Sequence, residues 1–233
     1  MNFKGKYKAL TFSYDDGVTQ DIRLIGIFNK YGLKGTFNLN SGLLGRRDWL
    51  ANGTIRQYKV LPDEVKDVYA GHEVAVHTVT HPNLTLLTPA GALAQVEDDR
   101  KALEELVGYP ICGMAYPCGG VNNNDAVASL IAENTPIRYA RTITSNGLFL
   151  PQTNLMRFEP TVYHCEFEKM AALADEFLAA EADEEHPKIF YIWGHAYEFD
   201  PADSWDRFER LCARLAGHDD VFYGTNREVL LGL

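Results

Sequence analysis

Short apolar runs alternate with stretches of helical periodicity along the whole chain, and this alternation predicts βα units that build a parallel sheet. The run Ala9-Leu10-Thr11-Phe12 is typical of these segments, because it is apolar enough for a buried strand. Strands are predicted at residues 8–13, 35–39, 72–77, 111–115, 138–142, 155–158, 188–193 and 221–224. Periodicity alone fits either a closed (β/α) barrel or an open doubly wound sheet.

Helices are predicted between these strands from their apolar stripes and their start and stop signals. The clearest helix has Thr88 as its N-cap and Pro89 in its first turn, and it ends at Gly108. The other helices are predicted at residues 19–31, 62–69, 125–133, 167–180, 204–216 and 225–231. Gly32 and Gly71 follow the first two of them, as expected where a helix ends in a left-handed turn.

Polar residues lie at the carboxyl ends of the predicted strands, where the functional side chains of a closed parallel barrel gather. Five segments contribute to this group: Asp15 and Asp16 after the first strand, His77 at the end of the third, Tyr116 to Cys118 after the fourth, Arg141 near the end of the fifth, and His195 after the strand at 188–193. The sequence therefore predicts that these residues meet at one mouth of the sheet.

Two of these segments together favour a metal site. The first strand ends in Asp15-Asp16-Gly17, which places two adjacent carboxylates at its tip, and His77 and His81 are four residues apart. One carboxylate and two neutral imidazoles leave an open coordination position for a water molecule, and the second carboxylate is then free to handle a proton. Each signal also has a structural interpretation, since Asp-Asp-Gly is a common turn and paired histidines occur on polar surface turns.

Length and composition predict one domain over residues 1–233. The chain is 46% hydrophobic and 12% aromatic, and it contains no linker, repeat or low-complexity stretch. Its formal net charge is −10 and its sequence pI is about 5.1. Binding to phosphate groups needs a basic surface, so we expect neither a nucleic acid nor an anionic membrane as a partner. The sequence leaves the oligomeric state open.

The start of the chain and the cysteines bear on its compartment. The basic residues 1–8 are not followed by the apolar segment of a signal peptide, and no window approaches the roughly 18 apolar residues of a membrane span. We therefore expect a soluble, cytoplasmic protein. The cysteines show no C-x-x-C spacing, which predicts reduced structural thiols, and no base adjoins Cys118 in the sequence to activate it as a nucleophile.

Four motifs resemble those of a known family. T-F-S-Y-D-D-G at 11–17 resembles a T-F-D-D-G signature, and H-T-V-T-H at 77–81 resembles an H-[ST]-x-x-H signature. A-Y-P-C-G at 115–119 corresponds to R-x-P-Y in a degraded form, and I-W-G-H at 192–195 corresponds to L-x-H. In motif order and spacing the chain is similar to the polysaccharide deacetylase family (NodB homology, carbohydrate esterase family 4-like).

The resemblance implies a fold and a division of labour in the site. The fold is a distorted, seven-stranded parallel (β/α) barrel that is similar to a TIM barrel. Asp16, His77 and His81 would hold a divalent metal ion, most simply Zn²⁺, although the same ligands accept Co²⁺, Ni²⁺ or Fe²⁺. Asp15 would act as the general base and His195 as the general acid.

The chain also departs from the family pattern in two places. Ala115 stands where the family has the arginine that pairs with the base aspartate, and we expect Arg141 to take over this pairing with Asp15. The family's D-x-x-D-W motif has no clear match. The residue that orients His195 is therefore left open among three candidates, namely Glu159, Glu198 and Asp200.

Substrate contacts are expected at Tyr116, Pro117, Cys118, Arg141 and Trp193. Aromatic faces can form the apolar wall of a sugar site, and the resemblance places an oxyanion-binding backbone N–H at Cys118. We therefore expect a hydrolase that removes an N-acetyl or other acyl group from a carbohydrate or a related small N-acyl compound. The missing leader favours a small soluble substrate over a cell-wall polymer.

Two alternatives stay open. One is an esterase or small-molecule amidase of the same superfamily, which includes metal-independent ureide hydrolases. The intact set of Asp16, His77 and His81 weighs against a metal-independent version. The other alternative is a carbohydrate-binding protein that has lost turnover, and Ala115 together with the missing motif speaks for it.

Overall fold

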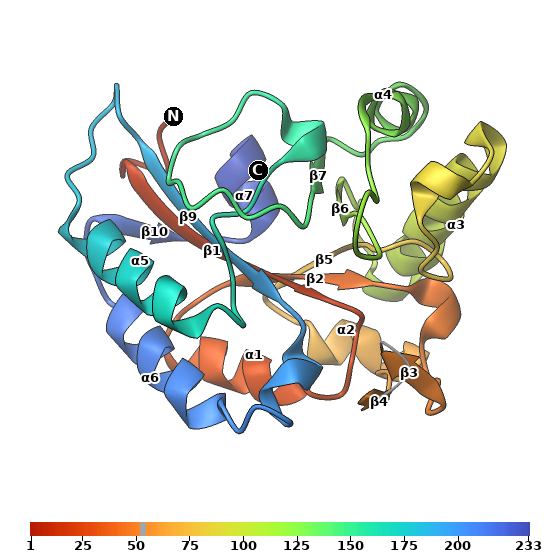
Figure 1. Cartoon of the computed structure of the whole chain (residues 1–233), viewed down its shortest axis with the longest axis horizontal. Helices are drawn as coiled ribbons and strands as arrows, with labels where there is room; N and C mark the ends of the chain where they lie inside the picture. The colour runs from red at the N-terminus through yellow and green to blue at the C-terminus, as the bar shows by residue number, and fades with distance from the viewer. Residues whose placement is uncertain (52–54) are drawn as a thin grey trace.

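One curled sheet of parallel strands forms the centre of the computed structural model, which describes residues 1–51 and 55–233 (Figure 1). Its strands are β1 (Lys8–Asp15), β2 (Gly35–Leu39), β5 (Glu73–Val76), β6 (Gly113–Ala115), β7 (Tyr139–Arg141), β8 (Val162–Tyr163), β9 (Lys188–Gly194) and β10 (Val221–Tyr223). Seven of them follow the order β7-β6-β5-β2-β1-β9-β8, and β10 pairs with the first residues of β1. The parallel barrel-type fold expected from the resemblance is therefore confirmed.

The segment that precedes β8 links the two ends of this sheet. At its start, the Phe158 N–H donates to the Ala140 carbonyl of β7, and the Thr142 N–H donates to the Phe158 carbonyl. At its end, the Thr161 N–H donates to the Tyr191 carbonyl of β9, and β8 pairs with β9 directly. The sheet thus curls round as a barrel of irregular spacing, in which β7 and β9 are joined by a short, distorted strand.

Side chains along β1 point alternately to the outside and to the interior of the barrel, and this alternation determines which of them reach the carboxyl end of the barrel. Phe12 packs outward against Phe28, with 4.6 Å between ring centroids. Ser13 faces the barrel interior, where its hydroxyl accepts a hydrogen bond from Arg141 Nε at 3.2 Å. Because side chains in a strand alternate with a period of two, Asp15 also points inward, at the last position of the strand. The strand therefore delivers this carboxylate to the carboxyl end of the barrel.

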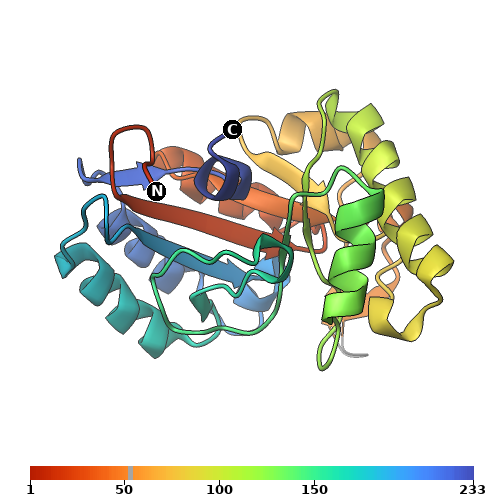
Figure 2. The same cartoon turned by 90° about the horizontal axis from the view of Figure 1, so that it is seen from above.

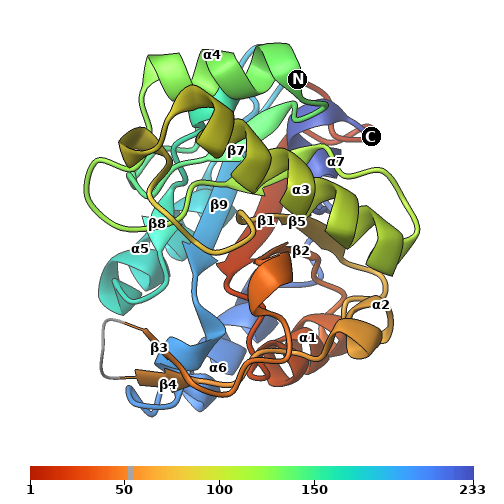
Figure 3. The same ribbon diagram turned by 90° about the vertical axis from the view of Figure 1, so that its right-hand side faces the viewer.

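Helices surround the strands, as Figures 2 and 3 show, with α3 and α4 side by side near one end of the sheet. They are α1 (Asp21–Lys30), α2 (Val65–Val68), α3 (Pro89–Val107), α4 (Asp125–Asn134), α5 (Phe167–Ala179), α6 (Trp205–Leu215) and α7 (Asn226–Leu231). The predicted caps of α3 are confirmed, since the Thr88 hydroxyl accepts from the Gly91 N–H and Gly108 has φ +79°. Within residues 1–51 and 55–233, no helix is both long and apolar enough to cross a membrane.

The secondary structure differs from the prediction in several places, and one predicted strand was wrong. Residues 155–158 do not form a strand, because Leu155–Arg157 is the 3₁₀ turn η4 and only Phe158 makes a strand-like bridge. A short apolar run is compatible with a strand and with a 3₁₀ turn, so the sequence pattern does not distinguish the two. The antiparallel pair of β3 (Trp49–Ala51) and β4 (Ile55–Gln57) was not predicted, and it lies outside the central sheet (Figure 3). Residues 62–69 divide into the 3₁₀ turn η2 (Pro62–Glu64) and α2.

Candidate active site

A cavity of about 430 Å³ opens where the carboxyl ends of the strands meet. Most of the predicted site residues line it: Asp15, Asp16, His77, His81, Tyr116, Cys118, Trp193 and His195. Pro117 and Arg141 do not line it. The Pro117 carbonyl accepts from Asn122 Nδ2 within a buried turn, and Arg141 lies fully buried behind Asp15. The expected direct substrate contacts at these two positions are therefore wrong.

Asp16, His77 and His81 form a set that fits a divalent metal ion. One ligand atom from each lies within 4.8 Å of the others, and Asp16 Oδ1 is 3.6 Å from His81 Nε2. Asp16 Oδ1 is buried and has no hydrogen-bond partner among the described residues, which is the state expected of an oxygen reserved for a cation. His77 Nδ1 lies 2.9 Å from the Ala115 carbonyl oxygen, so its Nδ1–H can donate there and leave the lone pair of Nε2 for a metal.

Backbone geometry turns the two motif loops toward each other. Asp16 has φ +84° and His81 has φ +61°, which are left-handed values that residues with a Cβ seldom adopt. His81 is followed by Pro82, which disfavours right-handed helix for the residue before it. The surrounding hydrogen bonds hold these conformations, as is common where backbone strain positions functional groups.

Asp15 is held ionised by its neighbours. Arg141 Nη2 forms an ion pair with Asp15 Oδ2, and Asn38 Nδ2 donates to Oδ1 at 2.8 Å. Burial alone would raise the pKa of Asp15, but the Arg141 guanidinium, followed by His77 and His195, brings the pKa below its ordinary value. Arg141 at the end of β7 thus lies where it was expected, and it takes over the electrostatic task that a family arginine would perform from position 115.

Gln57 at the end of β4 and Lys59 just after it support Asp16, and sequence reasoning missed both. Gln57 Nε2 donates to Asp16 Oδ2 at 3.1 Å. Lys59 Nζ donates to the Asp16 carbonyl at 2.8 Å and lies 3.7 Å from Oδ1. Burial would raise the pKa of Asp16, yet Lys59 and then His81 lower it far below its ordinary value. A lysine and a glutamine in a polar, weakly patterned segment gave no signal of this contact.

Glu198 orients His195. Its Oε2 lies 3.0 Å from His195 Nδ1 and 2.8 Å from His164 Nε2, and the Tyr163 hydroxyl donates to Oε1. Burial lowers the pKa of His195, but the hydrogen bond to Glu198 together with the negative charges of Glu198, Asp15 and Asp16 outweighs it and raises the pKa to about 9. At neutral pH His195 therefore carries a proton, and its Nε2 lies 3.8 Å from Asp15 Oδ2.

The other two candidates for this orienting role are excluded by their position. Asp200 accepts hydrogen bonds from Gln20 Nε2 at 2.8 Å and from Trp205 Nε1 at 2.7 Å. Glu159 lines a separate cavity. The question that the sequence left open is thus decided in favour of a glutamate three residues after the histidine.

Trp193 and Cys118 form parts of the cavity wall. Trp193 stacks on Tyr163 with 4.5 Å between ring centroids, and the Arg141 guanidinium lies 4.5 Å from the Trp193 ring. The Cys118 sulfur lies 3.3 Å from the His81 carbonyl oxygen, and burial raises the pKa of this thiol. A neutral thiol is a weak nucleophile, in agreement with the expectation for Cys118.

The comparison with known families covers the first part of this site. The sequence model of the polysaccharide deacetylase family matches residues 2–139, which are more than half of the chain and include Asp15, Asp16, His77 and His81. The chain belongs to the polysaccharide deacetylase family. The matched span ends before Arg141 and His195, so the parts these residues play rest on their geometry.

Individual polysaccharide deacetylases are only distantly similar to the chain. YxkH of Bacillus subtilis (strain 168), provisionally named as a member, is 23% identical over 129 residues, which are 54% of this chain and 42% of YxkH. The chain thus matches less than half the length of that relative. The fold of a provisionally assigned polysaccharide deacetylase from Mycobacterium smegmatis matches with a TM-score of 0.69 at 16% identity, over 98% of this chain and 91% of the other.

A further similar structure is that of BA3943 from Bacillus anthracis, which is described as a CE4 family pseudoenzyme. Its TM-score is 0.59 at 16% identity, over 98% of this chain and 66% of that chain. At such identities the likeness shows the shared fold alone. Membership of the family therefore leaves turnover to be argued from the side chains of the chain itself.

Proposed function

We propose that the chain is a metal-dependent hydrolase that removes an N-acetyl or related acyl group from a carbohydrate or a small N-acyl compound. The observation that supports this most directly is the pairing of opposite protonation states in one cavity. Asp15 is kept ionised by Arg141, and His195 is kept protonated by Glu198. His195 Nε2 lies 3.8 Å from Asp15 Oδ2. A general base and a general acid separated in this way are what hydrolysis of an amide requires.

The ligand set of Asp16, His77 and His81 suits zinc first, and cobalt, nickel or iron also fit two imidazoles and a carboxylate. Bound there, such an ion would acidify a water molecule and polarise the acyl oxygen of the substrate. Lys59 and Gln57 hold Asp16 in place for this task. Asp16 Oδ1 has no hydrogen-bond partner among the described residues, so it is available as a ligand.

The protein side chains then move the protons. Asp15 accepts a proton from the attacking water, and the Arg141 guanidinium keeps that carboxylate anionic until it does so. The Cys118 N–H makes no hydrogen bond within the described residues, so it is available to donate to the oxygen that becomes negative. His195 Nε2 protonates the departing amine, and Glu198 compensates the charge on the ring before this transfer.

A carbohydrate is favoured as substrate by the cavity wall. Trp193 and Tyr163, stacked on each other, provide aromatic surface beside several polar groups, a combination that suits a sugar ring with its apolar face and its hydroxyl rim, whereas Tyr116 is fully buried. The net charge of −10 fits a neutral or cationic compound better than an anionic one. An ester substrate would use the same base and metal ligands, and its alcohol would also leave with the proton of His195.

The test is acetate release from a panel of N-acetylated saccharides by zinc-loaded protein, before and after chelation. Substitution Asp15→Asn should lower kcat by about 10²–10⁴-fold, because the water loses its base. Asp219→Asn, an exposed change of the same kind, should have no effect. Full turnover in Asp15→Asn, or turnover that survives chelation, would contradict the proposal. Binding without acetate release would favour the carbohydrate-binding alternative.

A further inference from the structure

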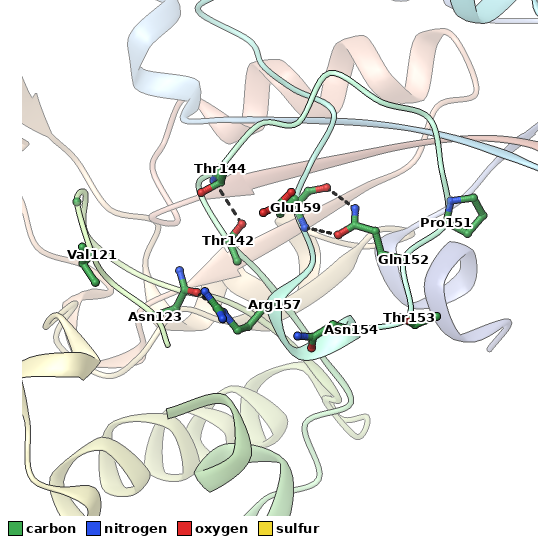
Figure 4. Close-up of a pocket in the computed structure, with 11 residues that line it drawn as sticks. Val121, Asn123, Thr142, Thr144, Pro151, Gln152, Thr153, Asn154, Arg157 and Glu159 are labelled. Atoms are coloured by element: carbon green, nitrogen blue, oxygen red, sulfur yellow. Dashed lines mark hydrogen bonds between the residues drawn. The ribbon is translucent and has the colours of Figure 1, made fainter. Parts of the chain in front are cut away.

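A small cavity of about 200 Å³ shares Glu198 with the candidate active site. His164, Cys165 and Arg207 also line it, and it has no residue in common with the cavity at Glu159 that Figure 4 shows. Glu198 is the residue that orients His195. The wall of this small cavity therefore contains a group on which the candidate active site depends.

Three potential metal ligands meet in the small cavity. His164 and Cys165 directly follow β8, and Glu198 lies in the 3₁₀ turn η5 (Ala196–Phe199) after β9. Because β8 and β9 are paired in parallel, the segments that follow them lie side by side. One ligand atom from each of the three residues lies within 4.8 Å of the others, and His164 Nε2 is 2.8 Å from Glu198 Oε2. The two strands thus bring an imidazole, a thiol and a carboxylate together.

The His164 ring is held by its surroundings in a position that suits a ligand. Its side chain is buried, and a Cβ added at Gly194 would lie 2.4 Å from the ring, so only glycine permits this close approach of the β9 backbone. His164 Nδ1 lies 3.3 Å from the Tyr14 hydroxyl oxygen. With its proton on Nδ1, the ring donates to Tyr14 and leaves the lone pair of Nε2 for a metal ion, and metal-binding histidines usually make such a second hydrogen bond.

The small cavity is accessible, and its donor atoms suit zinc. Cys165 is exposed, and the Glu198 side chain is 18% exposed. Arg207 brings a positive charge to the wall, but its guanidinium pairs with Glu168 and lies over the Phe167 ring. A thiolate, an imidazole and a carboxylate favour Zn²⁺ over Mg²⁺ or Ca²⁺, which prefer ligand sets made of oxygen atoms.

We propose that His164, Cys165 and Glu198 bind a second zinc ion that inhibits the protein. Zinc would bond to the thiolate sulfur, to His164 Nε2 and to a carboxylate oxygen, with water as a fourth ligand. The thiol proton is released to solvent, and the His164 ring carries its single proton on Nδ1. Displacing the thiol proton and the hydrogen bond between His164 and Glu198 costs free energy. We therefore expect this ion to bind only at zinc concentrations well above those that saturate Asp16, His77 and His81.

The inhibition follows from the shared carboxylate. Glu198 Oε2 lies 3.0 Å from His195 Nδ1, and a zinc ion on Glu198 would draw negative charge away from that hydrogen bond. His195 would then lose the group that orients it. This consequence rests on the proposed hydrolytic function, whereas binding of the second ion does not.

Cobalt titration of chelator-treated protein tests the binding. Co²⁺ bound to a thiolate absorbs strongly in the near ultraviolet by charge transfer, and Co²⁺ bound to imidazole and carboxylate alone does not. Wild-type protein should bind two equivalents, and the thiolate absorption should develop with the second. His81→Gln should bind one equivalent and keep the absorption, and Cys165→Ser should bind one equivalent without it. Cys112→Ser, a matched control outside both cavities, should behave as wild-type protein does.

Three other outcomes of the titration decide between the sites. A single equivalent that is lost in His81→Gln and shows no thiolate absorption overturns the inference. Thiolate absorption that is lost in Cys118→Ser but kept in Cys165→Ser also overturns it, because Cys118 lines the candidate active site. A single equivalent with the absorption, lost in Cys165→Ser and kept in His81→Gln, supports the second site and contradicts the proposed metal site instead.

Alkylation of the cysteines gives a second measurement of binding, with zinc itself as the ligand. In His81→Gln protein, iodoacetamide should react with Cys165 about tenfold more slowly at a free zinc concentration ten times the Kd of the second site, because only the free thiol reacts. Cys112 is the internal control, and its rate should stay the same. An unchanged rate at Cys165 overturns the inference.

Inhibition is measured by acetate release at rising zinc concentrations. At a free zinc concentration ten times the Kd of the second site, wild-type turnover should fall about tenfold from its maximum, and Cys165→Ser should not show this fall. An equal fall in both proteins would refute the inhibitory role. Absence of acetate release at every zinc concentration would contradict the proposed function, while the cobalt and alkylation results still decide the second site.

Discussion

Replacing Glu198 with glutamine removes the charge that keeps His195 protonated while preserving the shape of the side chain. Burial lowers the pKa of His195, but the hydrogen bond to Glu198 at 3.0 Å and the negative charges of Glu198, Asp15 and Asp16 together outweigh it and raise the pKa to about 9. Without that charge, burial still lowers the pKa while Asp15 and Asp16 still raise it, and we expect the pKa to return to about its ordinary value of 6.5. At pH 8 the protonated fraction then falls from about nine-tenths to about 3%, so kcat/KM should fall about 30-fold, whereas at pH 6 it should change less than about twofold.

The assay is the pH dependence of kcat/KM for acetate release by zinc-loaded wild-type and Glu198→Gln protein. The basic limb of the profile should move to lower pH by about 2.5 pH units, because the acid loses its proton at a lower pH. Glu176→Gln, an exposed change on α5, is the control and should keep the wild-type profile. Thermal melting establishes that both variants fold. A uniform loss of activity at every pH, with the basic limb unmoved, would refute the electrostatic reasoning.

Three further predictions concern stability and metal binding. Arg141→Met should lower the free energy of unfolding by about 3–5 kcal/mol at pH 7, because Asp15 is left as an unpaired buried charge. Urea denaturation should show a smaller loss below about pH 4, where Asp15 can be protonated, and an equal loss at both pH values would contradict the pairing. Added zinc should stabilise wild-type protein by about 2.7 kcal/mol at a free concentration 100 times its Kd. In a thermal melt, His81→Gln should lose this stabilisation, whereas His186→Gln, a change at an exposed residue, should keep it. Burial raises the pKa of Glu73 from 4.5 to about 7, so the native state holds this proton more tightly and wild-type stability falls as pH rises through that window. Between pH 4 and pH 8, the free energy of unfolding of Glu73→Gln should rise by about 3 kcal/mol relative to that of wild-type protein. A difference in unfolding free energy that does not depend on pH would argue against a buried titrating carboxyl.

The strands and helices were largely predictable because their signals are local. β1 contains the apolar run Ala9-Leu10-Thr11-Phe12 and leads into Asp-Asp-Gly, and α3 has a threonine N-cap and a terminal glycine. At residues 155–158 the same local signals predicted a strand wrongly, since a run of four residues with apolar character is compatible with a strand or a 3₁₀ turn. The outcome there depends on whether a neighbouring strand offers backbone partners, which is a tertiary property.

The sequence by itself determined the groups that are close together along the chain or at the tips of successive strands. Asp15, Asp16, His77 and His81 could be named because a parallel sheet brings its carboxyl ends to one edge. Only the tertiary structure decided that Lys59 supports Asp16 and that Glu198, not Glu159 or Asp200, orients His195. The reason is physical. A metal site depends on residue type at strand ends, whereas the pKa of a buried group depends on which charges lie within a few ångströms of it, and that is fixed by packing between segments far apart in the chain.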